Sequence, residues 1–161
     1  MKQSVKNYIR LDKVPTTAHY ESVVAEDEVL LNGQHIILGD VLNTAEGEEM
    51  AFEKAVAGGK YDAIVVPVYL TQGTLSEDIA YEAIEAGRPA RALIPVKGDI
   101  ISINSELAPD VNKGDSVAIG TDGLGYKVAT GEEIVVGRAI DINFLRGIGN
   151  LTVIRLNNAN A

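Results

Sequence analysis

The tripeptide Lys-Gly-Asp occurs twice in the sequence, at 97–99 and 113–115, and each copy carries a carboxylate that could do chemistry. Asp99 and Asp115 could form an acid–base pair, which needs different surroundings to separate the two pKa values. A recognition tripeptide on a protruding loop is the second possibility. Both copies, however, are followed at once by an apolar, strand-like run. We therefore predict that each Lys-Gly-Asp is a turn that starts a strand, with a glycine of free φ and an aspartate bonded to the backbone.

Other polar motifs give little support for catalysis or for phosphate binding. The stretch GTDGLG at 120–125 resembles the start of a phosphate loop, but it lacks the Lys-Ser/Thr pair and the helix that should follow. We interpret Asp122-Gly123 as a hairpin turn. Neither a GxSxG elbow nor an SxxK motif occurs in the sequence.

Patterns for metal binding are equally weak. His19 and His35 each lack a second histidine at i+2 or i+4, and we expect both to be exposed or half-buried imidazoles. The acidic runs at 26–28 and 46–49 lack the alternating spacing of a calcium loop, so a solvated acidic face is the simpler interpretation. The sequence has no cysteine, which excludes disulfides and thiolate ligands. We expect no catalytic residue, no metal and no cofactor.

The composition indicates a globular protein with an aliphatic core. The chain has 161 residues, of which 46% are apolar but only 5% are aromatic, and it has no tryptophan. No apolar run approaches the ~20 residues that span a bilayer. The N-terminus lacks the continuous apolar region of a secretory signal. We expect a soluble protein with no membrane partner.

Charge is distributed unevenly along the chain. The formal net charge is −9, and phosphates repel a chain of this sign, so we do not expect nucleic acid as a partner. The first fourteen residues carry the basic side chains Lys2, Lys6, Arg10 and Lys13 against the single acidic residue Asp12, whereas acidic residues dominate between positions 21 and 53. A basic arm on an acidic body is a pattern for docking onto an acidic protein or onto a second copy of the chain. A frayed, solvated terminus is the alternative.

One segment has the pattern of a helix. The stretch SEDIAYEAIEAG at 76–87 has Ser76 as N-cap, acidic residues in the first turn, and a stripe of isoleucine and alanine. Gly87 stands at the C′ position, and Pro89 forbids continuation. The sequence therefore predicts a short helix that ends before Gly87.

Elsewhere the sequence predicts short strands separated by turns. The apolar run at 62–70 predicts a buried strand, and Asn32-Gly33 within 29–38 predicts a hairpin. The segment 46–59 fits a strand or a helix, and we favour a strand. From residue 88 onward, strand-like runs recur with glycine turns between them, which is typical of a small barrel or sandwich.

These patterns divide the chain into three parts. We expect residues 1–27 to form an N-terminal arm, residues 28–90 a mixed α/β half, and residues 91–161 a small all-β half that packs with 28–90 as one compact unit. The predicted fold class is α+β, mainly β: a small β-barrel domain with one short helix and an extended N-terminal arm.

The stretch EAGRPARALIPVKGDIISI at 85–103 and the later cadence GDSVAIG…GLGYKVATGEEIVVGRAIDI resemble a known family. They are similar to the head decoration, or cement, proteins of tailed double-stranded DNA bacteriophages, with a domain of the β-tulip (SAF-like) group. The resemblance covers about 29–142 and rests on this cadence.

The resemblance implies a non-enzymatic protein on the exterior of the virion. Such proteins bind the outside of the capsid, commonly as homotrimers, and tie neighbouring major capsid subunits together. Extended N-terminal segments often make these contacts, which here would fall to Lys2, Lys6, Tyr8, Ile9, Arg10 and Leu11.

Two alternatives stay open. A virion fibre or adhesin would bind host glycans through loops such as 121–125. A SAF-like domain that binds a small ligand or acts on sugar acids would need a polar site, for which Arg91, Asp99 and Arg138 are the candidates.

Overall fold

The computed structural model describes residues 8–15, 17–25, 27–44, 47–66, 83–84, 86–146 and 149–157. Over these ranges the chain folds into strands and one short 3₁₀ turn, Thr121–Gly123. The same ranges contain no α-helix, and therefore no helix of the length and apolarity that crossing a membrane requires. The mainly β fold class predicted from the sequence is confirmed.

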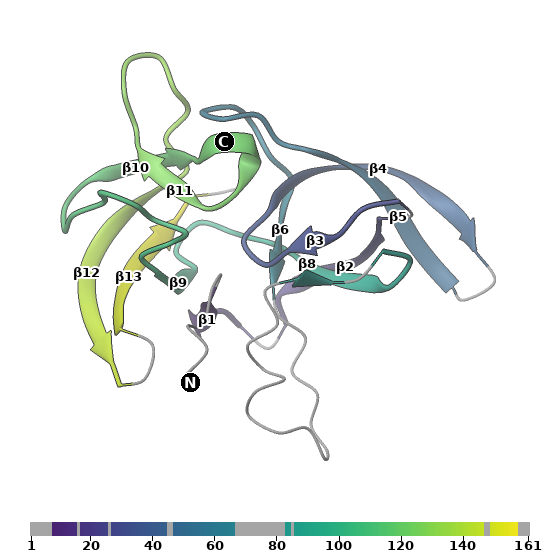
Figure 1. Ribbon diagram of the computed structural model, residues 1–161, viewed down its shortest axis with the longest axis horizontal. Coiled ribbons are helices and arrows are strands. Elements are labelled where there is room, and N and C mark those ends of the chain that lie inside the picture. The colour runs from purple at the N-terminus through teal and green to yellow at the C-terminus, as the bar shows by residue number, and fades with distance from the viewer. Residues whose placement is uncertain are drawn as a thin grey trace.

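Six strands of the described chain form one antiparallel sheet, the six-stranded sheet (Figure 1). In spatial order they are β1 (Ile9–Lys13), β9 (Ile100–Asn104), β13 (Gly149–Leu156), β12 (Gly137–Leu145), β10 (Ser116–Ile119) and β11 (Tyr126–Val128). All but β1 come from the C-terminal part of the chain. The N-terminal strand β1 therefore closes one edge of a sheet built by residues about ninety positions later.

Five further strands close into a barrel. In order they are β2 (His19–Val24), β5 (Gly47–Lys54), β4 (His35–Thr44), β6 (Ala63–Val66) and β8 (Pro89–Ile94). Closure removes free strand edges, which are the usual sites of unwanted pairing. The strands β4 and β5 extend beyond the barrel as a projecting ribbon (Figure 1). Two short strands, β3 (Leu30–Leu31) and β7 (Ala83–Ile84), pair separately.

The strand β6 joins the barrel to the sheet because its side chains alternate between two cores. Ala63 and Val65 pack in the barrel core, whereas Ile64 and Val66 pack in the main core, which the barrel shares with the six-stranded sheet. All four side chains are fully buried. A strand with both faces buried has a continuous apolar run, which is why the sequence predicted a buried strand here. The predicted range was 62–70, and residues 67–70 lie outside the described ranges.

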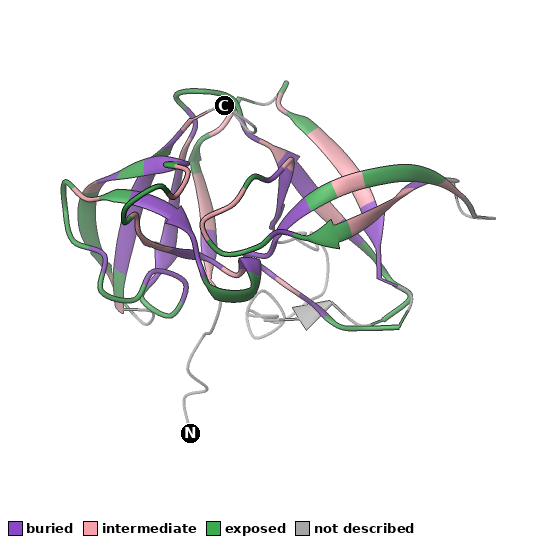
Figure 2. Ribbon diagram, turned by 90° about the horizontal axis from the view of Figure 1, so that it is seen from above, coloured by how far each residue is buried: buried purple, intermediate pink, exposed green. Residues whose placement is uncertain are grey.

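The main core lies between the barrel and one face of the six-stranded sheet. The barrel contributes Leu93, and the sheet contributes Ile101, Ile103 and Ile154, all fully buried. Figure 2 shows buried segments within both the sheet and the barrel, while the β4–β5 ribbon is mostly exposed or half-exposed. The two halves are thus held together by apolar burial, worth roughly 25 cal/mol for each Å² removed from water.

The helix predicted at 76–87 is wrong in its last part. Ala83–Ile84 form strand β7, which pairs with β3, and the residues from 76 to 82 lie outside the described ranges. A short stripe of isoleucine and alanine fits either structure, and the partner strand far away in sequence decides between them. Gly87 does adopt a positive φ of 79°, and its amide donates to the carbonyl of Ala25 (2.8 Å).

The hairpin predicted at Asn32-Gly33 is also wrong, although the turn exists. Gly33 has a φ of 90°, and the amide of Gln34 donates to the carbonyl of Leu31 (3.2 Å). The strands on either side separate, because β3 pairs with β7 while β4 pairs with β5 and β6. The turn itself docks on β6, where the amide of Gly33 donates to the carbonyl of Val65 (2.8 Å).

The segment expected to be an extended N-terminal arm contains two strands. Ile9–Lys13 pairs with β9, and His19–Val24 pairs with β8. Ile9 is only 1% exposed, so burial of its side chain fixes β1 to the main core. The described part of this segment is therefore integral to the two sheets, and residues 1–7 lie outside the described ranges.

The remaining strand predictions are confirmed. The ambiguous segment 46–59 forms β5, as favoured. The runs after residue 88 form β8 to β13. The strands β10 and β11 pair as a hairpin around Asp122-Gly123.

Candidate interaction surface

Asp99 closes the turn that starts β9. Its carboxylate accepts a hydrogen bond from the amide of Val96 (3.1 Å), and its own amide donates to the Val96 carbonyl (3.1 Å). Gly98 has a φ of 103°, and its amide donates to the carbonyl of Leu156 on β13 (3.0 Å). The amide of Leu156 donates in return to the Asp99 carbonyl (2.8 Å), so the turn also fixes β9 against β13.

Asp115 repeats this arrangement at the start of β10. Its carboxylate accepts from the amide of Asn112 (2.8 Å), and its amide donates to the Asn112 carbonyl (3.1 Å). Gly114 has a φ of 95°, and its amide donates to the carbonyl of Ala139 (2.7 Å). Both copies of Lys-Gly-Asp are therefore strand-starting turns, as predicted, and both carboxylates are bonded within their own turns.

The loop 121–125 is folded back onto the chain rather than held out. Its three amides at residues 123–125 all donate to backbone carbonyls, and the Asp122 carbonyl accepts a hydrogen bond from Nε2 of Gln34 (2.9 Å). Phosphate loops instead direct several N–H groups outward to the anion. The geometry supports the hairpin-turn interpretation and gives no support to a phosphate site in this loop.

His35 lies in the main core between two tyrosines. Its ring is nearly perpendicular to those of Tyr61 and Tyr126, with centroid separations of 4.9 and 4.8 Å. Nδ1 of His35 lies 3.0 Å from the carbonyl oxygen of Gly123, and because a carbonyl only accepts, Nδ1 carries the proton. The prediction of an exposed or half-buried imidazole at this position is therefore wrong. His35 is a buried, neutral histidine, and one backbone hydrogen bond and two aromatic contacts hold its ring in place.

Burial perturbs all three groups of this cluster. It lowers the pKa of His35 to about 4, against the opposing effect of the bond to Gly123. Burial also raises the pKa of Tyr61 and the pKa of Tyr126. The negative charge of Asp99 raises the pKa of Tyr61 further. Perturbed pKa values in a cleft would indicate catalysis, but these side chains are 0–1% exposed. We interpret the cluster as packing.

His19 is exposed, as predicted, and its Nε2 lies 2.6 Å from a carboxylate oxygen of Glu21. Of the acidic runs, Glu28 pairs with Lys54 (2.7 Å). Within the described ranges, no three His, Asp or Glu side chains gather in a group that could hold a metal ion.

The three side chains that were candidates for an enzymatic site each make a separate contact. The guanidinium of Arg91 lies 4.4 Å from the centre of the Tyr20 ring. Asp99 bonds its own turn, and Nε of Arg138 donates to the carbonyl of Gly114 (3.3 Å). These contacts do not bring the three side chains together into one site.

The structure places the sequence-predicted contact residues in different environments. Tyr8, Ile9, Arg10 and Leu11 are described, whereas Lys2 and Lys6 lie outside the described ranges. Ile9 is buried and Leu11 packs against the main core, so both side chains serve the fold. Tyr8 and Arg10 are half-buried, and Nε of Arg10 donates to Asp12 (2.6 Å).

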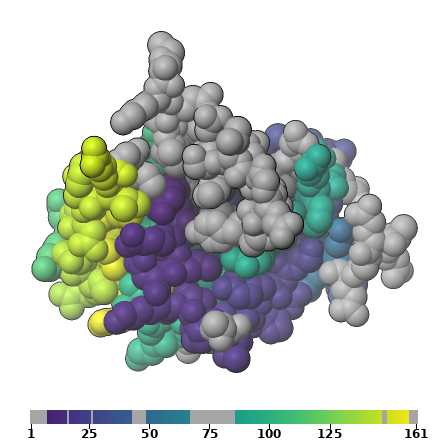
Figure 3. All heavy atoms as spheres, turned by 90° about the horizontal axis from the view of Figure 1, so that it is seen from below, coloured from purple at the N-terminus to yellow at the C-terminus, as the bar shows by residue number. Residues whose placement is uncertain are grey.

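The β12–β13 hairpin reaches the same end of the six-stranded sheet as the start of β1. In register, Ile142 of β12 faces Thr152 of β13, Thr152 faces Ile103 of β9, and Ile103 faces Ile9 of β1. In Figure 3 the purple N-terminal residues lie beside the yellow-green residues of the C-terminal hairpin. The described chain therefore begins at the same end of the sheet as this hairpin, with β9 and β13 between β1 and β12.

Phe144 near this tip is 75% exposed, more than any other large apolar side chain of the described residues. Ile142, on the same face, is 38% exposed, and Arg146 follows in an exposed position. Aromatic residues and arginine are the usual anchors of protein interfaces. We call Ile142, Phe144 and Arg146 the sheet-end surface.

Sequence reasoning missed this surface. The available signal was that Phe144 is one of only two phenylalanines and lies beyond Ala139, the last core residue of β12. A register shift between Ala139 and Asp141 decides the face on which Ile142 and Phe144 lie, and the sequence does not reveal it. How far β12 and β13 extend beyond the core depends on where the barrel stops covering the sheet, which is a property of the tertiary structure.

No family model and no curated protein matches the chain. Among solved structures, the chain is similar to the N base of the head fiber gp8.5 of bacteriophage phi29. The two chains are 12% identical, the match covers 89% of this chain and 97% of that chain, and the TM-score is 0.54. At this identity the likeness shows a shared fold alone.

Proposed function

We propose that this protein is a structural component of a bacteriophage virion that binds the outer surface of the capsid and stabilises contacts between major capsid subunits. The observation that carries the proposal is the shared fold with the phi29 head-fiber base, over nearly all of both chains. Fold likeness is an argument by analogy. The fold likeness agrees with the resemblance of residues 85–103 to phage decoration proteins, which was found from the sequence alone. A β-tulip (SAF-like) domain and a trimeric state are part of the same proposal.

The sheet-end surface is the contact we propose with the capsid. Burying an aromatic side chain contributes roughly 1.5–3 kcal/mol, and Phe144 projects beyond the core with Ile142 beside it. Strand β1 begins at this same end of the sheet, and in the proposal an N-terminal segment and the hairpin tip act together. The proposal includes no catalysis, no cofactor, no membrane and no nucleic acid.

A capsid pelleting assay tests the proposal. Purified protein is mixed with expanded capsids that lack it, and the bound fraction is measured after sedimentation. Phe144→Asp should raise the Kd for the capsid at least about tenfold, because it places a charge in an apolar contact. Val56→Asp is the matched control, since Val56 is 69% exposed at another site. Equal binding by wild type and Phe144→Asp would remove the sheet-end surface from the proposal, and no binding by the wild type would refute the capsid role.

A fiber is the second candidate function, because the phi29 neighbour is described as the base of a head fiber. A fiber base would bind the capsid and present a partner or a host ligand at a distance from it. Binding of the purified protein to host cells, with no binding to capsids, would favour an adhesin over a decoration protein. The folded-back loop 121–125 is then not the expected ligand site.

A further inference from the structure

Three basic side chains form a row across the outer face of the six-stranded sheet. In register, Lys13 of β1 faces Ile100 of β9, Ile100 faces Arg155 of β13, Arg155 faces Arg138 of β12, and Arg138 faces Ser116 of β10. Residues directly opposite each other point to the same face. Lys13, Arg138 and Arg155 are all exposed, and we call them the basic row.

The basic row points away from the chain's own barrel. Ile154 and Leu156, on either side of Arg155, are fully buried in the main core that the sheet shares with the barrel. Ala139, next to Arg138, is buried in the same core. Because side chains alternate between the two faces of a strand, the acidic residues of the barrel lie on the far side of the sheet from the basic row.

The row is costly to the isolated chain. Arg138 and Arg155 are directly opposite on neighbouring strands, where like charges destabilise the pair. Among the described residues, neither guanidinium has an ion-pair partner; Arg138 donates only to the carbonyl of Gly114 (3.3 Å). A pair of opposed arginines without a direct ion-pair partner favours binding to an acidic surface.

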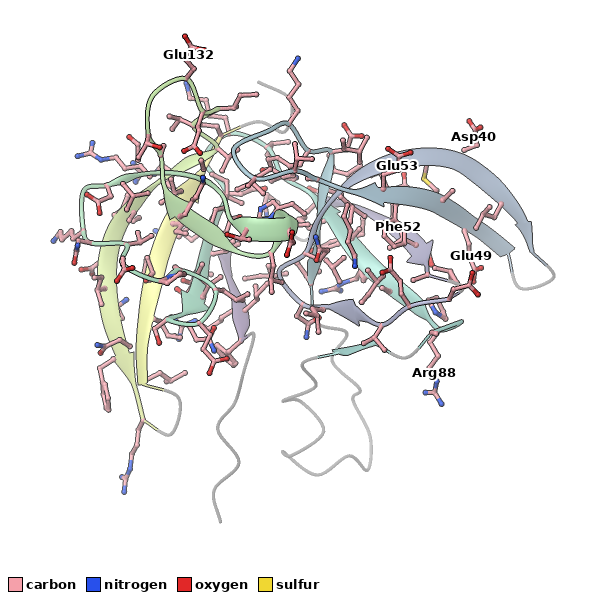
Figure 4. All side chains as sticks on the ribbon, turned by 45° about the horizontal axis from the view of Figure 1, so that its top comes forward. Asp40, Glu49, Phe52, Glu53, Arg88 and Glu132 are labelled. Atoms are coloured by element: carbon pink, nitrogen blue, oxygen red, sulfur yellow. The ribbon has the colours of Figure 1, made fainter. Side chains whose placement is uncertain are left out.

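The same chain carries such a surface. Residues 19–94, which include the barrel strands, contain fourteen acidic residues but only four Lys and Arg residues. The rest of the chain contains nine acidic residues and ten Lys and Arg residues. On the projecting β4–β5 ribbon, Asp40 and Glu53 are exposed, and Figure 4 shows both on the outer side of that ribbon. Ile37, directly opposite Glu53, is 39% exposed. We call Asp40, Glu53 and Ile37 the acidic ribbon.

We propose that the acidic ribbon of one copy docks on the basic row of another copy. The inference rests on the proposed function, which already includes a homo-oligomer, and it assigns the contact surfaces. A contact between two different surfaces is heterologous, so it closes into a ring or continues as a filament. A ring of three is the closed form that agrees with a trimer.

Charge reversal tests the contact. Arg155→Glu places a carboxylate opposite Arg138, so it should preserve or raise the free energy of unfolding while it weakens self-association at least about tenfold. Lys60→Glu is the matched control, because it makes the same change in charge at an exposed residue outside the basic row. The masses of the assemblies are measured by sedimentation velocity, with thermal unfolding of the same samples.

A rescue variant and a salt titration test whether opposite charges hold the two copies together. Arg138→Glu with Arg155→Glu should dissociate the oligomer, and the addition of Asp40→Lys with Glu53→Lys in the same chain should restore it. Association of the wild type should weaken between about 0.1 M and about 1 M salt, where the screening length falls to a few Å. Unchanged assembly in Arg155→Glu, or no recovery in the four-fold variant, would overturn the proposed contact.

The outcome is separable from that of the capsid assay. A wild-type monomer at all concentrations would refute the contact between copies, whatever the result of capsid pelleting. Conversely, Phe144→Asp lies outside both surfaces and should leave self-association unchanged. An oligomer that responds to charge reversal but never binds capsids would keep this inference and remove the decoration role.

Discussion

The ring of His35 lies edge-on to the ring of Tyr61, with centroids 4.9 Å apart and planes at 86°. Tyr126 approaches the same imidazole at 4.8 Å, also at 86°. His35 begins β4 of the barrel, and Tyr126 begins β11 of the six-stranded sheet. The aromatic cluster therefore joins the two halves of the protein through a histidine that must stay neutral.

Acid should destabilise the protein through His35. Its pKa is lowered from 6.5 to about 4 by burial, so between these pH values the unfolded chain binds a proton that the folded chain does not. The free energy of unfolding therefore falls as pH drops from 6.5 to about 4. The loss through this one group reaches about 3 kcal/mol. Urea unfolding across this pH range measures it.

One variant separates His35 from the other groups that titrate in acid. His35→Gln should flatten the pH dependence in this window. NMR titration of the wild type gives a second measurement that does not depend on a variant's folding. An imidazole that protonates near pH 6.5 in the native state would contradict the prediction.

Gly125 should tolerate no side chain. Its φ is 64°, and a Cβ there would overlap the backbone carbonyl oxygen of Leu107. Gly125→Ala should therefore cost more than about 3 kcal/mol, the sum of left-handed strain and a clash with fixed backbone. Gly131→Ala is the control, because Gly131 has a φ of 58° with no atom within 4 Å of the added Cβ, and should cost about 1 kcal/mol. Equal costs in chemical denaturation would contradict the clash.

The two Lys-Gly-Asp aspartates should prove equivalent in stability measurements. Asp99→Ala and Asp115→Ala each remove a carboxylate that accepts a backbone amide, and each should lower the free energy of unfolding by about 1 to 2 kcal/mol. The side chain of Glu132 projects into solvent in Figure 4, so Glu132→Ala should have little effect on the free energy of unfolding. Two aspartates that could be removed without loss of stability would reopen the search for a role outside the turns.

These turns show what local sequence determines. Gly98 and Gly114 both adopt positive φ, and both aspartates bond the amide three residues earlier, as the repeated tripeptide predicted. Turn geometry depends on the φ of one glycine and on one short side chain, so the sequence contains all that it needs.

Partner choice is where sequence reasoning failed. Asn32-Gly33 does reverse the chain, but β3 and β4 then pair with different strands, and Ala83–Ile84 is a strand because β3 lies beside it. Barrel closure and the insertion of β1 beside β9 depend on residues far apart in sequence. The candidate surfaces share this origin, since Phe144 is exposed only because the core ends before it, and the basic row exists only once four strands are in register.

Truncation at the N-terminus should separate folding from binding. Removal of residues 1–7 keeps the whole of β1 and the buried side chain of Ile9 in the chain, so the truncated protein should still fold. If the N-terminal segment contacts the capsid, the same truncation should weaken capsid pelleting. Ile9→Ala should do the reverse: it should cost about 2 to 5 kcal/mol, as expected for a buried isoleucine, and leave the binding of the folded fraction unchanged. Capsid binding that survives the loss of residues 1–7 would confine the contact to the hairpin tip around Phe144.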